Sequence, residues 1–380
     1  MARLDELCTL NMGQSPDSAS YNEVGDGLPF FQGNADFGVL HPKIRVWCNE
    51  PTKIAHPGDI LISVRAPIGA MNVADRECCI GRGLAALTVN ENLCNKGYIW
   101  YAISSKVEEL NAKGTGSTFK AISKGILGET EISLPSLDKQ YHIASILDKL
   151  TGLISLRKQQ LAKLDELVKT RFVEMFGDPI HNDYKLPQVP MTDLCEIIDG
   201  DRGENYPKQE EFFEQGYCLF LNAKNVTNTG FSYNTCMFIT QEKDECLRKG
   251  KLNRGDIVLT TRGTIGNLAF YDGTVPFENV RINSGMVILR IKSEMLSELF
   301  FMEQFKILLP SIKERIASGS AQPQLPISTM NKILMVLPEI DKQRNFSDFV
   351  GKVARQKLTI QQSLDKLEVL KKSLMQEYLG

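Results

Sequence analysis

Apolar residues recur every three or four positions from residue 143 to residue 177. The repeating positions are Ile143, Leu147, Leu150, Ile154, Arg157, Leu161, Leu164, Val168, Arg171 and Met175. Eight of these ten residues are apolar, and Lys, Arg, Asp and Glu occupy the other faces of the expected helix. A 3.5-residue period of this kind is typical of a coiled coil. At a rise of about 1.5 Å per residue, the predicted helix is about 50 Å long.

The same pattern returns 203 residues later. The second set of positions is Phe346, Val350, Val353, Lys357, Ile360, Leu364, Leu367, Lys371, Leu374 and Tyr378. The preceding residues repeat as well, because 134–140 read Leu-Pro-Ser-Leu-Asp-Lys-Gln and 337–343 read Leu-Pro-Glu-Ile-Asp-Lys-Gln. A heptad pattern that is duplicated in register with its leading sequence indicates an internal duplication.

Each predicted helix follows a region with short β-rich runs, Gly- and Pro-rich turns and one candidate helix. Residues 58–69 and 255–266 share Gly, Asp, Ile, Arg, Ile and Gly at the same places, and residues 282–285 correspond to residues 80–83. The predicted fold class is mixed α/β (α+β), with two similar globular domains separated by two long antiparallel coiled-coil helices. The predicted boundaries are 1–137 for the first globular domain, 138–178 for the central helix, 179–190 for a linker, 191–340 for the second globular domain and 341–380 for the C-terminal helix. Antiparallel packing is expected because each helix follows its globule at the same point and both must bury one seam.

Composition is ordinary for a globular protein, with 42% hydrophobic and 24% charged residues. The net charge of −2 provides no overall attraction for nucleic acid, so any such binding must rest on local clusters. Nine cysteines occur without a C-x-x-C pair, which favours a reduced, cytoplasmic chain. No signal peptide and no apolar run approaching 18 residues is present, so we expect a protein that is neither exported nor membrane-spanning.

The sequence lacks the motifs of common catalytic sites. It contains no phosphate-binding loop, no dinucleotide fingerprint, no nucleophile elbow and no methyltransferase Asn/Asp-Pro-Pro-Tyr/Phe motif. The four histidines, His41, His56, His142 and His181, are scattered. Asp59 and Asp256 could form a nuclease pair, but their position in a Gly-Asp turn before a strand favours a role in the turn. We therefore expect no catalytic residues, no metal and no cofactor.

The remaining candidate chemistry consists of cations and amides on loops flanked by small residues. The candidates are Arg65, Arg82 and Lys120 in the first copy and Arg262, Arg281, Gln322 and Gln324 in the second. Arginine can donate two hydrogen bonds to guanine, and glutamine can pair with adenine. Each residue alone could equally be a solvated loop side chain. Phe119 could stack on a base, although an aromatic residue in such a loop more often packs inside it. Because the pattern occurs in both copies, we predict that these loops contact nucleic acid.

In combination, the two Gly-Asp-Ile motifs, the polar loops before Leu-Pro-x-(Leu/Ile)-Asp-Lys-Gln and the two helices ending in Glu-x-x-Gly resemble the DNA-specificity subunit of type I restriction–modification enzymes. The resemblance covers the whole chain. It implies two target-recognition domains at opposite ends of an antiparallel helix pair, each reading half of a split target in double-stranded DNA. It also implies that the helices bind methyltransferase subunits, two of them, and that restriction or translocase subunits join the complex. Base-reading residues cannot be transferred by motif, so the contact residues above come from loop placement alone.

Two other functions remain open at this stage. One is a degenerate or fused DNA methyltransferase or nuclease, which turnover by the purified chain with S-adenosylmethionine, Mg2+ and DNA would reveal. The other is a purely structural coiled-coil scaffold, which would not shift DNA in a gel when its partners are added. The apolar face of each helix is wider than the seam, which suits packing of helix on helix plus a further partner.

Overall fold

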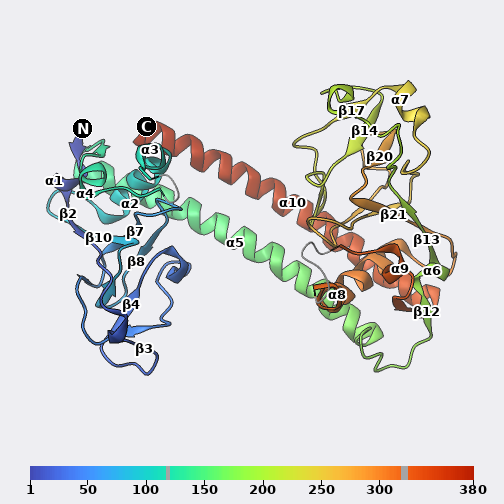
Figure 1. Cartoon of the computed structure of the whole chain (residues 1–380), viewed down its shortest axis with the longest axis horizontal. Coiled ribbons are helices and arrows are strands. Elements are labelled where there is room, and N and C mark those ends of the chain that lie inside the picture. The colour runs from blue at the N-terminus through green and yellow to red at the C-terminus, as the bar shows by residue number, and fades with distance from the viewer. Residues whose placement is uncertain (117–119, 318–323) are drawn as a thin grey trace. The chain divides into compact units, whose positions relative to one another are not determined.

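A computed structural model describes residues 1–116, 120–317 and 324–380 (Figure 1). The chain forms two compact units, which we call unit 1 (residues 1–159 and 361–380) and unit 2 (residues 160–360). The long helices α5 (Leu137–Phe176) and α10 (Ile340–Leu379) each contribute one part to each unit. The predicted boundaries of the globular domains remain predictions, because each unit includes parts of both helices.

The described residues of unit 1 form a four-stranded sheet, a five-stranded sheet, a two-stranded pair of β1 with β11 and four short helices. The first sheet is antiparallel, in the order β2 (Cys8–Met12), β10 (Leu84–Val89), β7 (Ile60–Ser63) and β8 (Met71–Val73). The second has the order β3 (Tyr21–Asn22), β5 (Trp47–Cys48), β4 (Leu28–Phe31), β9 (Cys78–Ile80) and β6 (Ile54–Ala55). The remaining elements are β1 (Ala2–Arg3), β11 (Glu131–Ile132), α1 (Leu4–Leu7), α2 (Lys96–Ser105), α3 (Val107–Lys113), α4 (Lys124–Gly128) and the 3-10 turns Ser18–Ser20 and Asn34–Asp36.

Strand β7 is buried on both faces, which explains why the Gly-Asp-Ile motif has a continuous apolar run. Alternate residues of a strand point to opposite faces of its sheet. Ile60 and Ile62 face the core that also holds α2 and the start of α5, whereas Leu61 faces the smaller core against the second sheet. The motif therefore predicts a central strand rather than an edge strand.

Unit 2 repeats the four-stranded sheet in the same order, β13 (Cys195–Asp199), β21 (Met286–Ile291), β18 (Ile257–Thr260) and β19 (Leu268–Phe270). Its other strands are β12 (Gln188–Pro190), β14 (Cys218–Leu221), β15 (Val226–Thr227), β16 (Gly230–Phe231), β17 (Phe238–Ile239), β20 (Val280–Ile282) and β22 (Leu334–Val336). Its helices are α6 (Met191–Leu194), α7 (Gln241–Cys246), α8 (Glu298–Ala317) and α9 (Ile327–Met330), with a 3-10 turn at Gln209–Glu211. The shared strand order confirms the internal repeat.

The two long helices pack antiparallel within each unit (Figure 1). In unit 2, Phe172 and Phe176 of α5 contact Phe346 of α10, with ring centroids 5.5 and 5.7 Å apart, and Asp165 pairs with Lys357 further along. A higher residue number on α5 therefore meets a lower number on α10. In unit 1, Leu147 of α5 shares a hydrophobic core with Leu379 of α10, and the Lys158 ammonium lies 2.8 Å from the Glu368 carboxylate. The predicted antiparallel arrangement is confirmed, and the apolar seam is the surface that it buries.

No helix within the described parts of the chain is long and apolar enough to cross a membrane.

Candidate nucleic-acid interface

Three loops of unit 1 meet just beyond the end of β7. The Val64 amide donates to the Gly83 carbonyl at 2.9 Å, and the Ala66 amide donates to the Lys120 carbonyl at 3.0 Å. These backbone bonds join the loops that carry the predicted residues Arg65, Arg82 and Lys120, and all three side chains are exposed. Within the described ranges, no carboxylate forms an ion pair with any of the three. Unit 1 therefore presents three uncompensated cations on adjoining loops.

Glycine is required where these loops approach other segments. A Cβ on Gly83 would lie 2.4 Å from the Gln32 carbonyl oxygen, which is far inside van der Waals contact. A Cβ on Gly13 would lie 2.2 Å from the Gly81 carbonyl oxygen. The tight turn between β9 and β10 is therefore packed against the loop after β2. This packing leaves the Arg82 side chain exposed on the turn.

Unit 2 builds the same junction with different side chains. Arg262 and Gln324 face each other in an antiparallel bridge, and the Leu325 amide donates to the Thr261 carbonyl at 3.0 Å. The Thr261 amide donates to the Gly285 carbonyl at 2.9 Å, which corresponds to the bond from the Val64 amide to the Gly83 carbonyl in unit 1. Arg262 and Gln324 are both exposed. Gln322 and, in the first copy, Phe119 lie outside the described residues.

Arg281 does not lie with the other candidates. It belongs to β20 and is 5% exposed, and its guanidinium donates to the Asp244 carboxylate and to the carbonyls of Lys249 at 2.7 Å and Leu247 at 3.1 Å. Proximity in the chain to residues 282–285 suggested a loop position, but the residue that matches Arg82 is Ser284. The guanidinium of Arg281 is fully used inside unit 2, so we leave it out of the candidate interface.

The buried pair of Arg281 and Asp244 makes the stability of unit 2 dependent on pH. Burial alone would raise the pKa of Asp244, but hydrogen bonds from Lys251 and Arg281 outweigh it and hold that pKa below its ordinary value. The pKa of Asp244 is therefore lower in the folded protein than in the unfolded chain. Its carboxylate contributes fully to stability at pH values above the unfolded-state pKa, and this contribution is lost as the pH falls through the folded-state pKa.

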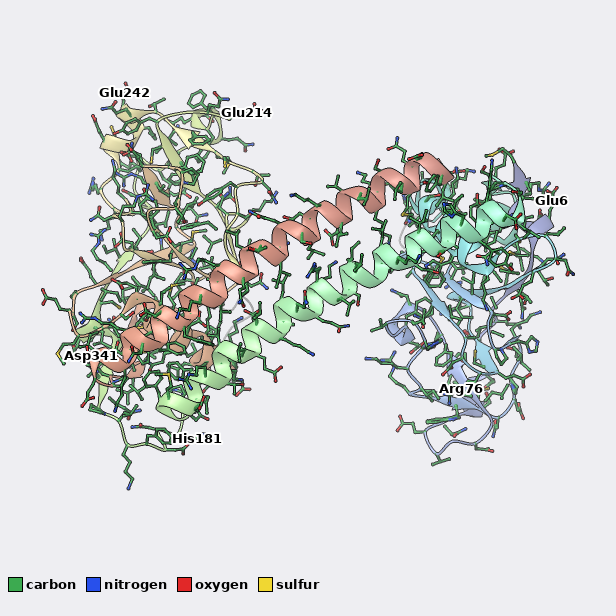
Figure 2. All side chains as sticks on the ribbon, turned by 180° about the vertical axis from the view of Figure 1, so that it is seen from behind. Glu6, Arg76, His181, Glu214, Glu242 and Asp341 are labelled. Carbon is green, nitrogen blue, oxygen red and sulfur yellow. The ribbon has the colours of Figure 1, made fainter. Side chains whose placement is uncertain are left out.

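We therefore predict that the free energy of unfolding falls as the pH drops below about 4, and that Asp244→Asn weakens this dependence. Urea denaturation from pH 3 to pH 6 measures it. Asp341→Asn is the control, because Asp341 is an 86% exposed side chain in the first turn of α10 (Figure 2). If the Asp244→Asn and wild-type curves run parallel below pH 4, this assignment is wrong.

Arg202 is a candidate that sequence reasoning missed. Its side chain is 50% exposed on the loop after β13, and it donates to the Ser284 carbonyl at 3.3 Å while pairing with Asp199. The corresponding loop of unit 1 holds Ser15, whose hydroxyl accepts a hydrogen bond from the Arg82 amide at 3.3 Å. The signal was present in the sequence, because Arg202 precedes Gly203 in a Gly-Asp-Arg-Gly run. Unit 2 thus carries its second loop cation on a different segment from unit 1.

The two acidic residues considered as a nuclease pair are buried in turns. Asp59 accepts hydrogen bonds from the His56 amide at 2.8 Å and the Thr88 hydroxyl at 2.7 Å. Asp256 accepts from the Asn253 amide at 2.7 Å and pairs with Arg290 at 2.8 Å. Each carboxylate closes its turn before a strand. Among the described residues, no group of three or more His, Cys, Asp or Glu side chains could hold a metal ion.

An exposed arginine on a loop flanked by small residues can enter a DNA groove and donate two hydrogen bonds to one guanine. Residues 1–166 and 187–369 match the sequence model of a family described as the type I restriction modification DNA specificity domain. The chain belongs to this DNA specificity family. It is a DNA-recognition subunit rather than a catalytic one, and the alternatives of a degenerate enzyme or a bare scaffold are not favoured.

Curated relatives of the chain are members of the DNA specificity family. The putative MjaX specificity subunit of Methanocaldococcus jannaschii is 40% identical over 158 residues, which are 42% of this chain and 37% of that protein. The MjaIX specificity subunit of the same organism is 25% identical over 339 residues, or 85% of this chain and 77% of the relative. The EcoBI specificity subunit of Escherichia coli is 18% identical over 367 residues, which are 90% of this chain and 76% of the relative.

Solved structures share the family fold. The S subunit of a type I restriction–modification system from M. genitalium superposes with a TM-score of 0.61 at 19% identity, covering 100% of this chain and 95% of that one. A second solved structure is described as the structural basis of complex assembly and conformational transition of the type I restriction–modification system. One of its chains superposes with a TM-score of 0.55 at 15% identity, covering 99% of this chain and 96% of that one. These similarities confirm the predicted fold class, with two mixed α/β globules and two long packed helices.

Proposed function

We propose that this chain reads a bipartite target in double-stranded DNA, with one half-site for each unit. The observation that carries the proposal is the repeated loop junction, which presents Arg65 in unit 1 and Arg262 in unit 2 at the same place beside the same four-stranded sheet. The residues proposed to contact DNA are Arg65, Arg82 and Lys120 for one half-site and Arg262, Gln324, Arg202 and, from the undescribed part of the loop, Gln322 for the other.

The two units differ in what surrounds the shared arginine, and this difference supports two different half-site sequences. Arg65 is bridged to Ala121, which follows Lys120, whose ammonium is a donor only, whereas Arg262 is bridged to Gln324, whose amide both donates and accepts. A donor pair suits guanine and phosphate, and an amide can pair with adenine. The net charge of −2 is compatible with this role if partner subunits also bind phosphates.

Partner subunits belong to the same proposal. Leu167 and Leu370 stand 203 residues apart, at equivalent positions of α5 and α10, and are 47% and 46% exposed. One lies in unit 2 and the other in unit 1. Two equivalent apolar positions favour two equivalent docking sites, so we propose that the helices bind two methyltransferase subunits and that restriction or translocase subunits join them. The nine free thiols favour a reduced, cytoplasmic location.

The function is tested by sequencing methylated sites in DNA from cells that express the chain with a methyltransferase subunit. We expect one motif made of two defined sequences separated by an unread spacer, and no such motif when this chain is omitted. A single continuous motif, or methylation that is independent of this chain, would contradict the proposal. The purified chain alone should show no turnover with S-adenosylmethionine, Mg2+ and DNA.

A further inference from the structure

The glutamine that ends the repeated Leu-Pro-x-(Leu/Ile)-Asp-Lys-Gln motif is buried in both units. In unit 1, Gln140 is 1% exposed, and its Oε1 accepts a hydrogen bond from the Asn95 amide at 2.9 Å. Its Nε2 donates to the Pro135 carbonyl at 2.8 Å and to the Leu93 carbonyl at 3.5 Å. One side chain therefore serves three backbone groups from two segments of the unit.

Unit 2 contains the same arrangement. Gln343 is fully buried, and its Oε1 accepts from the Ser297 amide at 3.0 Å. Its Nε2 donates to the Pro338 carbonyl at 2.7 Å and to the Met295 carbonyl at 2.9 Å. The partners correspond one to one with those of Gln140. We call each glutamine with its three backbone partners the glutamine joint of its unit.

Each glutamine joint connects a helix of the globule to the first turn of the long helix. Asn95 caps α2, because its side chain accepts a hydrogen bond from the Tyr98 amide at 2.9 Å. Ser297 directly precedes α8, and the two prolines lie before α5 and α10. The joint therefore holds the start of α2 or α8 against the start of the long helix in the same unit.

A buried amide with three partners resists rotation of these helices more strongly than an apolar contact does. Apolar packing is nondirectional, so a helix can slide or turn while keeping most of it. Hydrogen bonds require defined distances and angles, and a buried group that loses its partner is destabilised by the full cost of desolvation. Leucine or methionine could fill the same space, yet both units place a glutamine there.

We propose that Gln140 and Gln343 are positioning residues that set the angle between each recognition globule and its long helix, and thereby restrict the spacing at which the two half-sites can be read together. This inference rests on the proposed bipartite reading of DNA. It assigns the repeated motif a role in spacer discrimination rather than in base contact. The hydrogen-bond partners of both glutamines lie outside the loops that carry Arg65 and Arg262, so neither glutamine should alter the half-site sequences.

The test uses the full complex and a DNA pool in which both half-sites are kept and the spacer is the natural length, one base pair shorter or one base pair longer. Gln140→Met removes all three hydrogen bonds while keeping the side-chain length. We expect the preference for the natural spacer to fall at least tenfold, with unchanged half-site sequences, because the loss of one or two of the three hydrogen bonds would already have an effect of about that size. Gln343→Met should act in the same way.

The matched control is Gln159→Met, the same substitution at an exposed position of α5, where the glutamine Nε2 lies 3.5 Å from the Ser155 hydroxyl oxygen. It should leave the spacer preference unchanged. Gln140→Glu keeps an acceptor for the Asn95 amide but turns a carboxylate oxygen toward the Pro135 and Leu93 carbonyls, so it should lower the spacer preference at least as far as Gln140→Met. A role limited to stability would lower total methylation for every spacer equally.

Hydrogen exchange on the wild-type complex tests the joint independently of the variants. The backbone amides of Asn95 and Ser297 should exchange slowly, and the Asn95 amide should exchange faster in Gln140→Met. The inference is overturned if these amides are unprotected in the wild type, or if an active Gln140→Met complex keeps the wild-type spacer preference. If the wild-type complex itself shows no bipartite motif, it is the proposed function that fails.

Discussion

Replacing Arg262 with alanine should change one half of the methylated DNA target and leave the other half as it was. Arg262 is exposed on the junction beside β18, is bridged to Gln324 and has no carboxylate paired with it in the described structure. Loss of a bidentate base contact costs about 1–3 kcal/mol and relaxes specificity at one position. Sequencing of methylated sites from cells carrying the variant complex therefore should show one degenerate base position in one half-site.

Two further variants make the Arg262 experiment decisive. Arg65→Ala, at the equivalent place in unit 1, should relax a position in the other half-site. Arg344→Ala makes the same substitution at an exposed residue of the first turns of α10, where the arginine lies 3.7 Å from the Asp341 carboxylate, and should leave both half-sites intact. If Arg262→Ala alters both half-sites, or neither, the assignment of one half-site to each unit is wrong.

Inserting four residues between Lys158 and Gln159 should lengthen the unread spacer by one or two base pairs. Helix α5 runs without a break through this point, and four residues add about 6 Å to it. One base-pair step is about 3.4 Å, so the added length matches one or two steps. Four residues make just over one turn, so the apolar seam stays nearly in phase and both half-site sequences should be unchanged.

Control insertions separate helix length from general disturbance. A two-residue insertion at the same point turns the following helix by about 200°, which moves seam residues such as Val168 to the wrong face and should abolish activity. Four residues added in the loop between Asn182 and Asp183 should leave the spacer unaltered. A second four-residue insertion after Glu368, which pairs with Lys158, keeps the two helices equal in length and should give the same longer spacer. An unchanged spacer in an active helix-insertion complex would show that loops or partner subunits set the spacing.

Those features that depend on neighbouring residues could be predicted from the sequence alone. The seam from Ile143 to Met175 predicted α5, because a coiled-coil period is a local pattern of side-chain positions. The repeated turn at Asp59 and Asp256 predicted a strand after each turn, because the carboxylate accepts a hydrogen bond from an amide only three residues away. The same local motifs, present in both halves of the chain in the same order, carried the resemblance to the specificity family that the comparison confirms.

Only the tertiary structure decided which side chains lie together at the loop junctions. Arg65 and Lys120 stand 55 residues apart in the chain, and the bond between the Ala66 amide and the Lys120 carbonyl joins the two loops that carry them. Arg281 was expected on a loop, but the Asp244 carboxylate, 37 residues away on α7, holds it inside unit 2. Arg202 reaches the junction through a carbonyl 82 residues away. Hydrogen bonds and ion pairs between distant segments follow from the packing of the sheets, and no local pattern records them.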